Sequence, residues 1–250
     1  MRPEYAARYG DLSRWHWWFR GRQRIVEAVL HKELNKRKSL RIASVGCGPV
    51  EGLFWLAPLA EPKGCVLGVD PDQRHAVASH SNIYYVIGQL EATPLLTGAF
   101  DVVLALDVLE HVDDDAAGLR EAVRLLNPAG LLVVTVPAFP SLWGSQDVVN
   151  QHRRRYTKDA LHEVFVRAHL PRPRVSYFNS ILFPPIAAIR WARRALGLNE
   201  RARTDFEDNR PGLVNEALAA LFGLERYLVD RIPMPWGVSL LAVVRAAPRS

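Results

Sequence analysis

Four points in the sequence carry glycines or polar side chains at the ends of apolar runs. The segment "VGCGPVEG" (45–52) is rich in glycine, so a ligand can approach its backbone and meet free N–H groups. Asp70 ends the next apolar run, 22 residues after Gly48, and its carboxylate can accept hydrogen bonds from both hydroxyls of a ribose. Gln89 follows the third run and Asp107 ends the fourth. Because ligands of open α/β sheets bind at the carboxyl ends of strands, this spacing predicts one binding site there.

The glycine-rich segment does not match the dinucleotide-binding fingerprint. G-x-G-x-x-G requires a third glycine at the position where Glu51 stands. The Tyr-x-x-x-Lys pair of many nicotinamide oxidoreductases is also absent from the sequence. A nicotinamide-dependent oxidoreductase is therefore disfavoured.

The elements that would position these residues alternate between strands and helices. Short runs rich in Val, Ile and Leu are typical of strands buried on both faces of a parallel sheet, and they occupy 40–45, 65–70, 83–87, 100–107 and 130–137. Between them, 113–126 has helical periodicity, with acidic residues at its start and Asn127-Pro128-Ala129-Gly130 at its end. Two further runs, 174–178 and 237–246, predict late strands. This alternation predicts an α/β protein with βαβ units.

We therefore expect a Rossmann-like, doubly wound seven-stranded sheet with helical additions. The boundaries that we infer are a helical N-terminal arm or lid (1–37), a cofactor-binding core (38–178), a helical insertion (179–236), and a final strand and tail (237–250). The insertion has a polar break at 199–212.

Composition narrows the class of protein. The 250 residues include 49% hydrophobic and 23% charged residues, which is typical of a globular domain with a sizeable core. The net charge is +6, and charge alone does not choose between nucleic acid, anionic lipid and acidic substrates. Cys47 and Cys65 are too few for a disulfide framework, and the N-terminus lacks the apolar run of a signal peptide. We expect a cytoplasmic protein.

Five segments resemble the successive motifs of class I S-adenosylmethionine-dependent methyltransferases, of the methyltransferase type 11 kind. They are "VGCG", "GVDPD", "GQLEATPL", "FDVVLALDVLEHVDD" and "LREAVRLLNPAGLLVVTVPA", and together they span about 40 to 140. "HWWFRGR" (16–22) and "HRRRYT" (152–157) resemble segments of one bacterial subgroup. The resemblance implies S-adenosyl-L-methionine as the cofactor and methyl transfer as the activity.

The resemblance also implies a role for individual residues. Gly46, Cys47 and Gly48 would pass their backbone under the methionine part of the cofactor, and Asp70 would hold the ribose. The remaining implied contacts are with the adenine, from Pro71, Asp72, Gln89 and Leu90, and with the methionine moiety, from Asp107 and Val108.

Two residues depart from the family pattern. Ser44 stands where the first strand of the family usually carries an acidic residue, which helps to position the methionine amino group. Val50 stands where a glycine is expected. These departures are the only support for an alternative, a non-catalytic relative that binds the cofactor or a partner protein.

Acceptor chemistry requires alignment and, for a hydroxyl, a base such as histidine. His111, just past the fourth strand, would lie close to the methyl group, or it could simply pack at the start of a helix. The aromatic residues of the arm would either form a lid or anchor the arm in the core; they are Tyr9, Trp17, Trp18 and Phe19.

The segment "QHRRRYT" (151–157) follows the fifth strand at the same edge of the sheet. Successive residues entering a helix point in different directions, so we expect His152 and one arginine to face the acceptor, with Tyr156 packing or hydrogen-bonding there. Thr157 is a candidate cap for the helix that follows. A solvated basic turn is the alternative. Nucleic-acid binding is disfavoured, because that function usually requires a wider basic face with stacking aromatic residues.

The insertion is apolar and bears clustered arginines. Its most apolar stretch, 181–189, is too short to span a bilayer, yet the arginines of 180–198 beside an apolar helix suit anionic headgroups. It is either a cap over the last strands or a peripheral membrane contact at the inner membrane face.

The resulting hypothesis is a methyltransferase that acts on an oxygen, or a nitrogen, of a small or lipid-linked metabolite. His111, His152 and Tyr156 are the catalytic candidates. We expect no metal site, because no His, Asp and Glu residues show ligand spacing along the chain.

Overall fold

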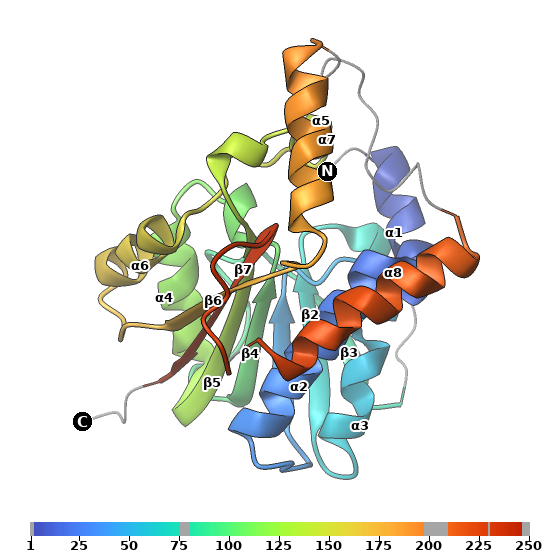
Figure 1. The fold of residues 1–250 in the computed structure, drawn as a ribbon. Helices are drawn as coiled ribbons and strands as arrows, with labels where there is room; N and C mark the ends of the chain where they lie inside the picture. Colours follow the sequence, from blue (N-terminus) through green and yellow to red (C-terminus); the bar gives the residue numbers. More distant parts are fainter. Residues whose placement is uncertain (1–2, 76–80, 198–209, 230, 247–250) are drawn as a thin grey trace.

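The computed structural model describes residues 3–75, 81–197, 210–229 and 231–246, without the side chains of residues 3–8. Its centre is a seven-stranded sheet in the order β3-β2-β1-β4-β5-β7-β6 (Figure 1). The strands are β1 (Arg41–Val45), β2 (Cys65–Asp70), β3 (Ile83–Ile87), β4 (Phe100–Leu106), β5 (Leu126–Pro137), β6 (Arg174–Phe178) and β7 (Ser239–Arg245). The first five strands pair in parallel, and β7 runs antiparallel between β5 and β6. The predicted Rossmann-like α/β fold with seven strands is confirmed.

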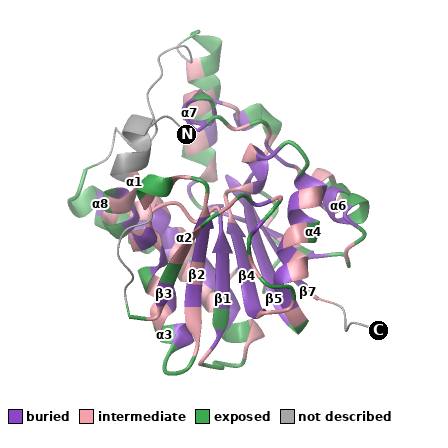
Figure 2. Ribbon diagram, turned by 180° about the vertical axis from the view of Figure 1, so that it is seen from behind, coloured by how far each residue is buried: buried purple, intermediate pink, exposed green. Residues whose placement is uncertain are grey.

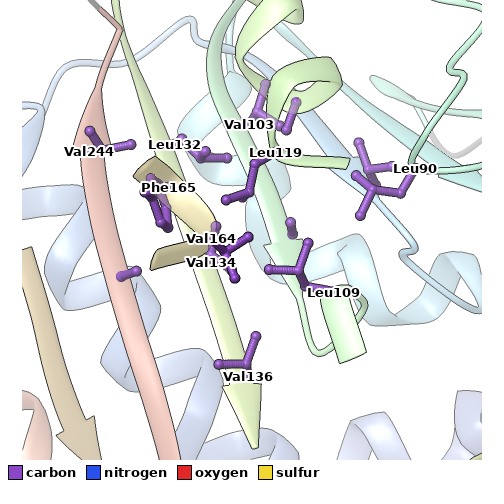
Figure 3. Packing of buried hydrophobic residues seen from close by; sticks show 14 of the residues in the cluster. Leu90, Val103, Leu109, Leu119, Leu132, Val134, Val136, Val164, Phe165 and Val244 are labelled. Carbon is purple, nitrogen blue, oxygen red and sulfur yellow. The ribbon is translucent and has the colours of Figure 1, made fainter. Parts of the chain in front are cut away.

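The sheet forms because its strands are apolar on both faces. On β4, Val103 and Ala105 belong to one buried cluster, whereas Val102 and Leu104 belong to the other. The first cluster includes side chains from α4 (Asp115–Leu125) and α6 (Lys158–Arg167), as Figure 3 shows. The second includes side chains from α2 (Trp17–Glu33) and α8 (Leu213–Leu224). Helices therefore cover both faces, and the central strands are buried throughout most of their length (Figure 2).

Side chains fix where the helices of the core begin. Asp114 caps α4, with the Ala117 N–H donating to its Oδ1 at 2.9 Å. Thr157 caps α6 as expected, with the Ala160 N–H at 3.1 Å from its Oγ1. Each cap satisfies an N–H group that has no partner inside the helix.

Short helices occupy the connections at the carboxyl ends of the strands. They are η1 (Val50–Leu56), η2 (Gln73–His75), η3 (Leu109–His111), η4 (Pro140–Leu142) and α5 (Ser145–Val149), and they shape the edge of the sheet at which the predicted site residues lie. α3 (Ala57–Ala60) lies at the opposite edge, where the Leu40 N–H just before β1 donates to the Leu59 carbonyl at 3.2 Å.

The arm and the insertion pack against one another on the same face of the sheet. The arm consists of α1 (Pro3–Trp15) and α2, and the insertion contains α7 (Phe183–Ala195), α8 and η6 (Glu225–Tyr227). Asn215 of α8 is fully buried; its Oδ1 accepts from the Trp17 N–H at 2.8 Å, and its Nδ2 donates to the Trp15 carbonyl at 2.7 Å. α7 projects beyond the body of the molecule (Figure 1), and most of the 199–212 break predicted in the insertion lies outside the described residues.

In the described part of the chain, every helix is either too short or too polar to cross a bilayer.

The packing of α2 on α8 predicts a steric effect at Gly21. A Cβ at this position would lie 2.0 Å from Cδ1 of Phe222, whose ring also stacks on Phe178. We expect Gly21→Ala to lower the free energy of unfolding by about 1–3 kcal/mol, because overpacking outweighs the better helix propensity of alanine. Urea unfolding followed by tryptophan fluorescence measures this.

Gly52→Ala is the matched control for this prediction. A Cβ at Gly52 would meet only the Cys47 carbonyl oxygen, at 3.8 Å, so its stability should change by no more than about 0.5 kcal/mol. Equal effects of the two substitutions would contradict the steric argument.

Candidate functional site

A cavity of about 1020 Å³ opens at the carboxyl ends of β1, β2 and β4. Its floor includes the turn after β1, Asp70 of β2 and Asp107, which follows β4. Side chains of α1, α2 and α7 complete its walls. The volume is suited to a ligand of cofactor size together with part of a second molecule.

The glycine-rich turn depends on two backbone conformations that favour glycine. Gly46 and Gly48 have φ values of +65° and +64°. A Cβ at Gly46 would lie 2.2 Å from Cγ2 of Val108, so this position also requires a residue without a side chain. Val50, which departs from the family pattern, is buried in the core at the start of η1, and Ser44 is buried within β1. Neither of these two side chains lines the cavity.

The Asp70 carboxylate is held in place by the turn that it faces. Its Oδ2 accepts from the Gly48 N–H at 2.8 Å, and its Oδ1 accepts from the Asp72 N–H at 3.0 Å. Nδ1 of His75 lies 3.5 Å from Oδ1. A carboxylate has about four acceptor positions, so Asp70 retains acceptors for hydroxyl groups of a ligand in the cavity.

The structure brings most of the predicted cofactor-binding residues together and separates two of them. Gly46, Cys47, Gly48, Asp70, Pro71, Asp72, Asp107 and Val108 all line the cavity. Gln89 is exposed and Leu90 is buried against Gly118 of α4, and neither residue lines the cavity. Directly before these two residues, Gly88 packs closely against Pro94, so the chain is tightly packed where it leaves β3.

Arg22 is a site residue that sequence reasoning missed. Its guanidinium forms an ion pair with Asp107, which also accepts from the Thr135 hydroxyl at 3.0 Å. The Arg22 guanidinium also lies over the Trp18 ring, with its Cζ 4.6 Å from the ring centroid, which is a cation–π arrangement. The available signal was its position in "HWWFRGR", but the partner is 85 residues away along the chain.

The aromatic residues of the arm both line the cavity and anchor the arm. Tyr9, Trp17, Trp18 and Phe19 all contribute to the wall. Trp17 and Trp18 also pack against the core cluster beneath, and the Phe19 ring makes edge contacts with Tyr9 at 5.4 Å and Trp18 at 5.1 Å. The two interpretations offered by the sequence are therefore compatible.

Two histidines and a glutamate form one polar wall. The rings of His111 and His152 meet edge to face with centroids 4.8 Å apart, and Nε2 of His152 lies 3.8 Å from Oε1 of Glu110. Burial, reinforced by the nearby His152, lowers the pKa of His111 to about 4. Burial raises the pKa of Glu110 well above its usual range, and the charge of Asp107 adds to this shift. Both histidines and Glu110 line the cavity.

The arginines of "QHRRRYT" point in different directions, as expected. Arg153 pairs with Asp113, and Nη1 of Arg154 lies 3.2 Å from Oδ2 of Asp115, so both meet the acidic loop. Arg155 is buried and lines the cavity, with its Nε 2.8 Å from Oδ1 of Asp147.

Tyr156 lies beneath the cavity rather than in its wall. Its buried hydroxyl is within 3.3 Å of the Leu109 carbonyl and 3.2 Å of Oδ2 of Asp115. The residue thus braces the loop that carries His111.

Comparisons with known proteins agree with this geometry. Residues 43–134 match the family model described as a methyltransferase domain. The ubiquinone biosynthesis O-methyltransferase of Azorhizobium caulinodans is 37% identical over 111 residues, which are 42% of this chain and 43% of that protein. Across the curated relatives that it matches, the chain spans between 36% and 62% of their length.

Solved structures extend the likeness to the whole fold. A chain of the complex between the Trm112 methyltransferase activator of Haloferax volcanii and a methyltransferase superposes with a TM-score of 0.59 at 17% identity, covering 99% of this chain and 96% of that one. Geranyl diphosphate methyltransferase in complex with S-adenosylmethionine gives a TM-score of 0.55 at 15% identity, covering 89% and 85%. At these identities the likeness concerns the fold.

The sheet order and the glycine turn facing Asp70 define a Rossmann-like α/β fold. Within it, residues 43–134 are similar to the methyltransferase domain that the family model describes.

The buried His16 in the arm predicts a pH dependence of stability. It caps α2, with Nδ1 accepting from the Trp18 N–H at 3.2 Å, and burial lowers its pKa from 6.5 to about 4. Between these values the unfolded chain binds the proton and the folded chain does not, so stability falls as the pH falls from 6.5 to 4. The loss attributable to His16 should be about 3 kcal/mol, because each unit of pKa shift corresponds to about 1.4 kcal/mol.

Urea unfolding at pH 7, 5.5 and 4 tests this prediction by comparison with His16→Asn. Asparagine also caps helices but does not titrate, so the variant should lose stability less steeply over this range. Identical pH profiles for parent and variant would contradict the assignment.

Proposed function

We propose that the protein transfers a methyl group from S-adenosylmethionine to an oxygen of a small or lipid-linked metabolite. The observation that carries this proposal is the continuity of one cavity, in which the turn and carboxylate suited to the cofactor lie beside the wall of Glu110, His111 and His152.

The residues of the cavity fit the parts of S-adenosylmethionine. Asp70 has acceptors for the ribose hydroxyls, and Pro71 and Asp72 beside it would border the adenine. At the other end, Nε of Arg22 is buried and donates to no group in the described part of the chain. Arg22 thus has a donor to spare for the methionine carboxylate, while Asp107 beside it suits the amino group.

The chemistry depends mainly on alignment. When bound, S-adenosylmethionine would supply a sulfonium methyl group for in-line displacement by an acceptor oxygen, with the O–CH₃ bond forming as the S–CH₃ bond breaks. His152, with Asp147 behind its ring, would receive the proton of the acceptor hydroxyl, and His111 would help to hold the acceptor oxygen in line. The aromatic arm would exclude water from the reacting groups. Tyr156 would act as a positioning residue, through its hydrogen bond to the Leu109 carbonyl.

Two observations indicate the class of acceptor, namely the side chains that line the cavity and the name of one relative. The cavity continues past the histidines to Ile186 and Ile189 of α7, so an acceptor with an apolar portion would fit. The Azorhizobium caulinodans relative is named as an O-methyltransferase, which favours oxygen over nitrogen.

Two substitutions should separate cofactor binding from turnover. Asp70→Ala removes the ribose acceptor and should weaken S-adenosylmethionine and S-adenosylhomocysteine binding by about 10- to 100-fold, the usual value of one or two hydrogen bonds to a charged group. His152→Ala should leave that affinity unchanged within about threefold and reduce turnover at least tenfold. Calorimetric titration measures the first effect, and release of S-adenosylhomocysteine with an acceptor found by screening measures the second.

Asp159→Ala is the control, because Asp159 is an exposed carboxylate on α6 away from the cavity. The proposed site would be wrong if Asp70→Ala and Asp159→Ala bound the cofactor equally well.

We further propose that α7 brings the protein to an anionic membrane surface that carries the acceptor. Ile189, Trp191 and Leu196 are 53%, 50% and 71% exposed, and Arg194 is exposed beside them. Ile189 lies on the rim of the cavity as well. An apolar chain anchored in a bilayer could therefore enter along α7, with the arginine at the headgroups.

Replacing both Trp191 and Leu196 by glutamate should abolish vesicle binding without affecting the cavity, which neither residue lines. We expect the parent protein to float with vesicles rich in phosphatidylglycerol and the double variant to remain at the bottom of the gradient. Val166→Glu, at a 71% exposed position on α6, is the matched control and should float like the parent. Equal flotation of the parent and the double variant would exclude this surface.

A further inference from the structure

Three side chains in the polar wall present potential metal ligands to one point. One ligand atom each from Glu110, His111 and His152 lies within 4.8 Å of the others. Atoms bound to a common Zn²⁺ at about 2.0–2.2 Å lie roughly 3–3.5 Å apart, so a pair at the 4.8 Å limit would have to draw in by roughly 1.3–1.8 Å. Because all three residues line the cavity, a metal ion bound between them would also face the open space of the cavity.

Glu110 is the strongest indication of a missing partner. Its side chain is fully buried, and neither carboxylate oxygen receives a hydrogen bond from another described residue. A buried carboxylate in this state is costly unless a proton or a cation neutralises it.

The neighbouring arginines are already engaged elsewhere. Arg22 pairs with Asp107, and Arg155 donates to Asp147 and to the Ala138 carbonyl. Glu110 is left facing imidazole groups, the nearest being Nε2 of His152 at 3.8 Å. The charge of Arg155 acts on Glu110, but neither carboxylate oxygen of Glu110 receives a hydrogen bond from an arginine in the described part of the chain.

The two histidines are oriented as metal-binding histidines usually are. Nδ1 of His152 is 2.8 Å from Oδ1 of the buried Asp147, which leaves Nε2 directed towards Glu110. One ring nitrogen of His111 is hydrogen-bonded to the backbone of Gln151, which leaves the other for the cavity. A carboxylate or carbonyl behind each imidazole fixes its tautomer and direction for a metal.

We propose that Glu110, His111 and His152 bind a divalent transition-metal ion. Two imidazoles and one carboxylate favour an ion such as Zn²⁺, Mn²⁺, Co²⁺ or Fe²⁺ over Mg²⁺ or Ca²⁺, which prefer oxygen ligands. Three protein ligands also leave at least one position open towards the cavity.

The expectation of no metal site came from spacing along the chain, and spacing could not reveal this arrangement. Glu110 and His111 are adjacent, and His152 joins them only through the fold. If the proposed methyl transfer holds, the open position would bind the acceptor oxygen and lower the pKa of its hydroxyl, and with the metal bound the two imidazoles would serve as its ligands instead of as proton acceptors.

The test is direct metal binding by the full chain, with neither cofactor nor acceptor present. After chelator treatment and dialysis, titration with Zn²⁺ should show one site per chain with a micromolar or lower dissociation constant. Titration with Co²⁺ should produce visible absorption bands of a low-symmetry site. Glu110→Gln and His152→Asn should each weaken binding at least tenfold.

Glu110→Gln retains the shape of the side chain and resembles a protonated glutamate, so it should fold and bind S-adenosylhomocysteine like the parent. His31→Gln is the matched control, since it removes an exposed histidine far from the cavity and should leave metal affinity unchanged. The absence of a one-site isotherm, or equal affinities in the parent, Glu110→Gln and His152→Asn, would overturn the proposal and indicate a protonated Glu110. Normal metal binding with no S-adenosylmethionine binding would instead count against the proposed function alone.

Discussion

The histidine wall of the cavity depends on one buried carboxylate, Asp147. Its Oδ1 receives hydrogen bonds from His152 and Arg155, both at 2.8 Å, and its Oδ2 accepts from the Gly144 N–H at 2.8 Å. Burial alone would raise its pKa, but the hydrogen bond of His152 and the charge of Arg155 lower the pKa to about 2. Arg190 of α7 lies 3.9 Å from the same group, so one charge links the loop after β5, a cavity histidine and the projecting helix. Removing one partner of such a cluster would leave an uncompensated charge in the interior, which is among the costliest changes a fold can undergo.

The half of the cavity that we propose for the cofactor is organised by backbone rather than by charge. Gly46 and Gly48 adopt left-handed conformations, and the Gly48 N–H anchors Asp70 across the turn. The two halves meet at Asp107, which Arg22 of the arm reaches from above. The arm is therefore part of the site and not only a cover for it.

The sequence predicted what depends on local pattern. Strands buried on both faces are continuous apolar runs, and polar residues that end them, such as Asp70 and Asp107, necessarily gather at one edge. The cap at Thr157 and the divergent directions of the three arginines also followed from local geometry.

The sequence pattern did not reveal contacts between segments that lie far apart along the chain. Arg22 and Asp107 are 85 residues apart, and the residues around one of them do not identify the other as its partner. Leu90 turned inward because the chain packs closely at Gly88 after β3, a feature of tertiary packing that no residue spacing encodes.

The bond between Asn215 and the arm has a consequence for how the protein is made. Trp17 leaves the ribosome early, yet the side chain that holds its backbone is 198 residues further along the chain. β7, which lies between β5 and β6, is also the last of the strands to be synthesised. Since domains fold in step with synthesis, β1 to β5 can pair while the aromatic arm still lacks its anchor. Until α8 and β7 follow, the nascent chain therefore exposes an unclosed cavity and the three tryptophans of the arm.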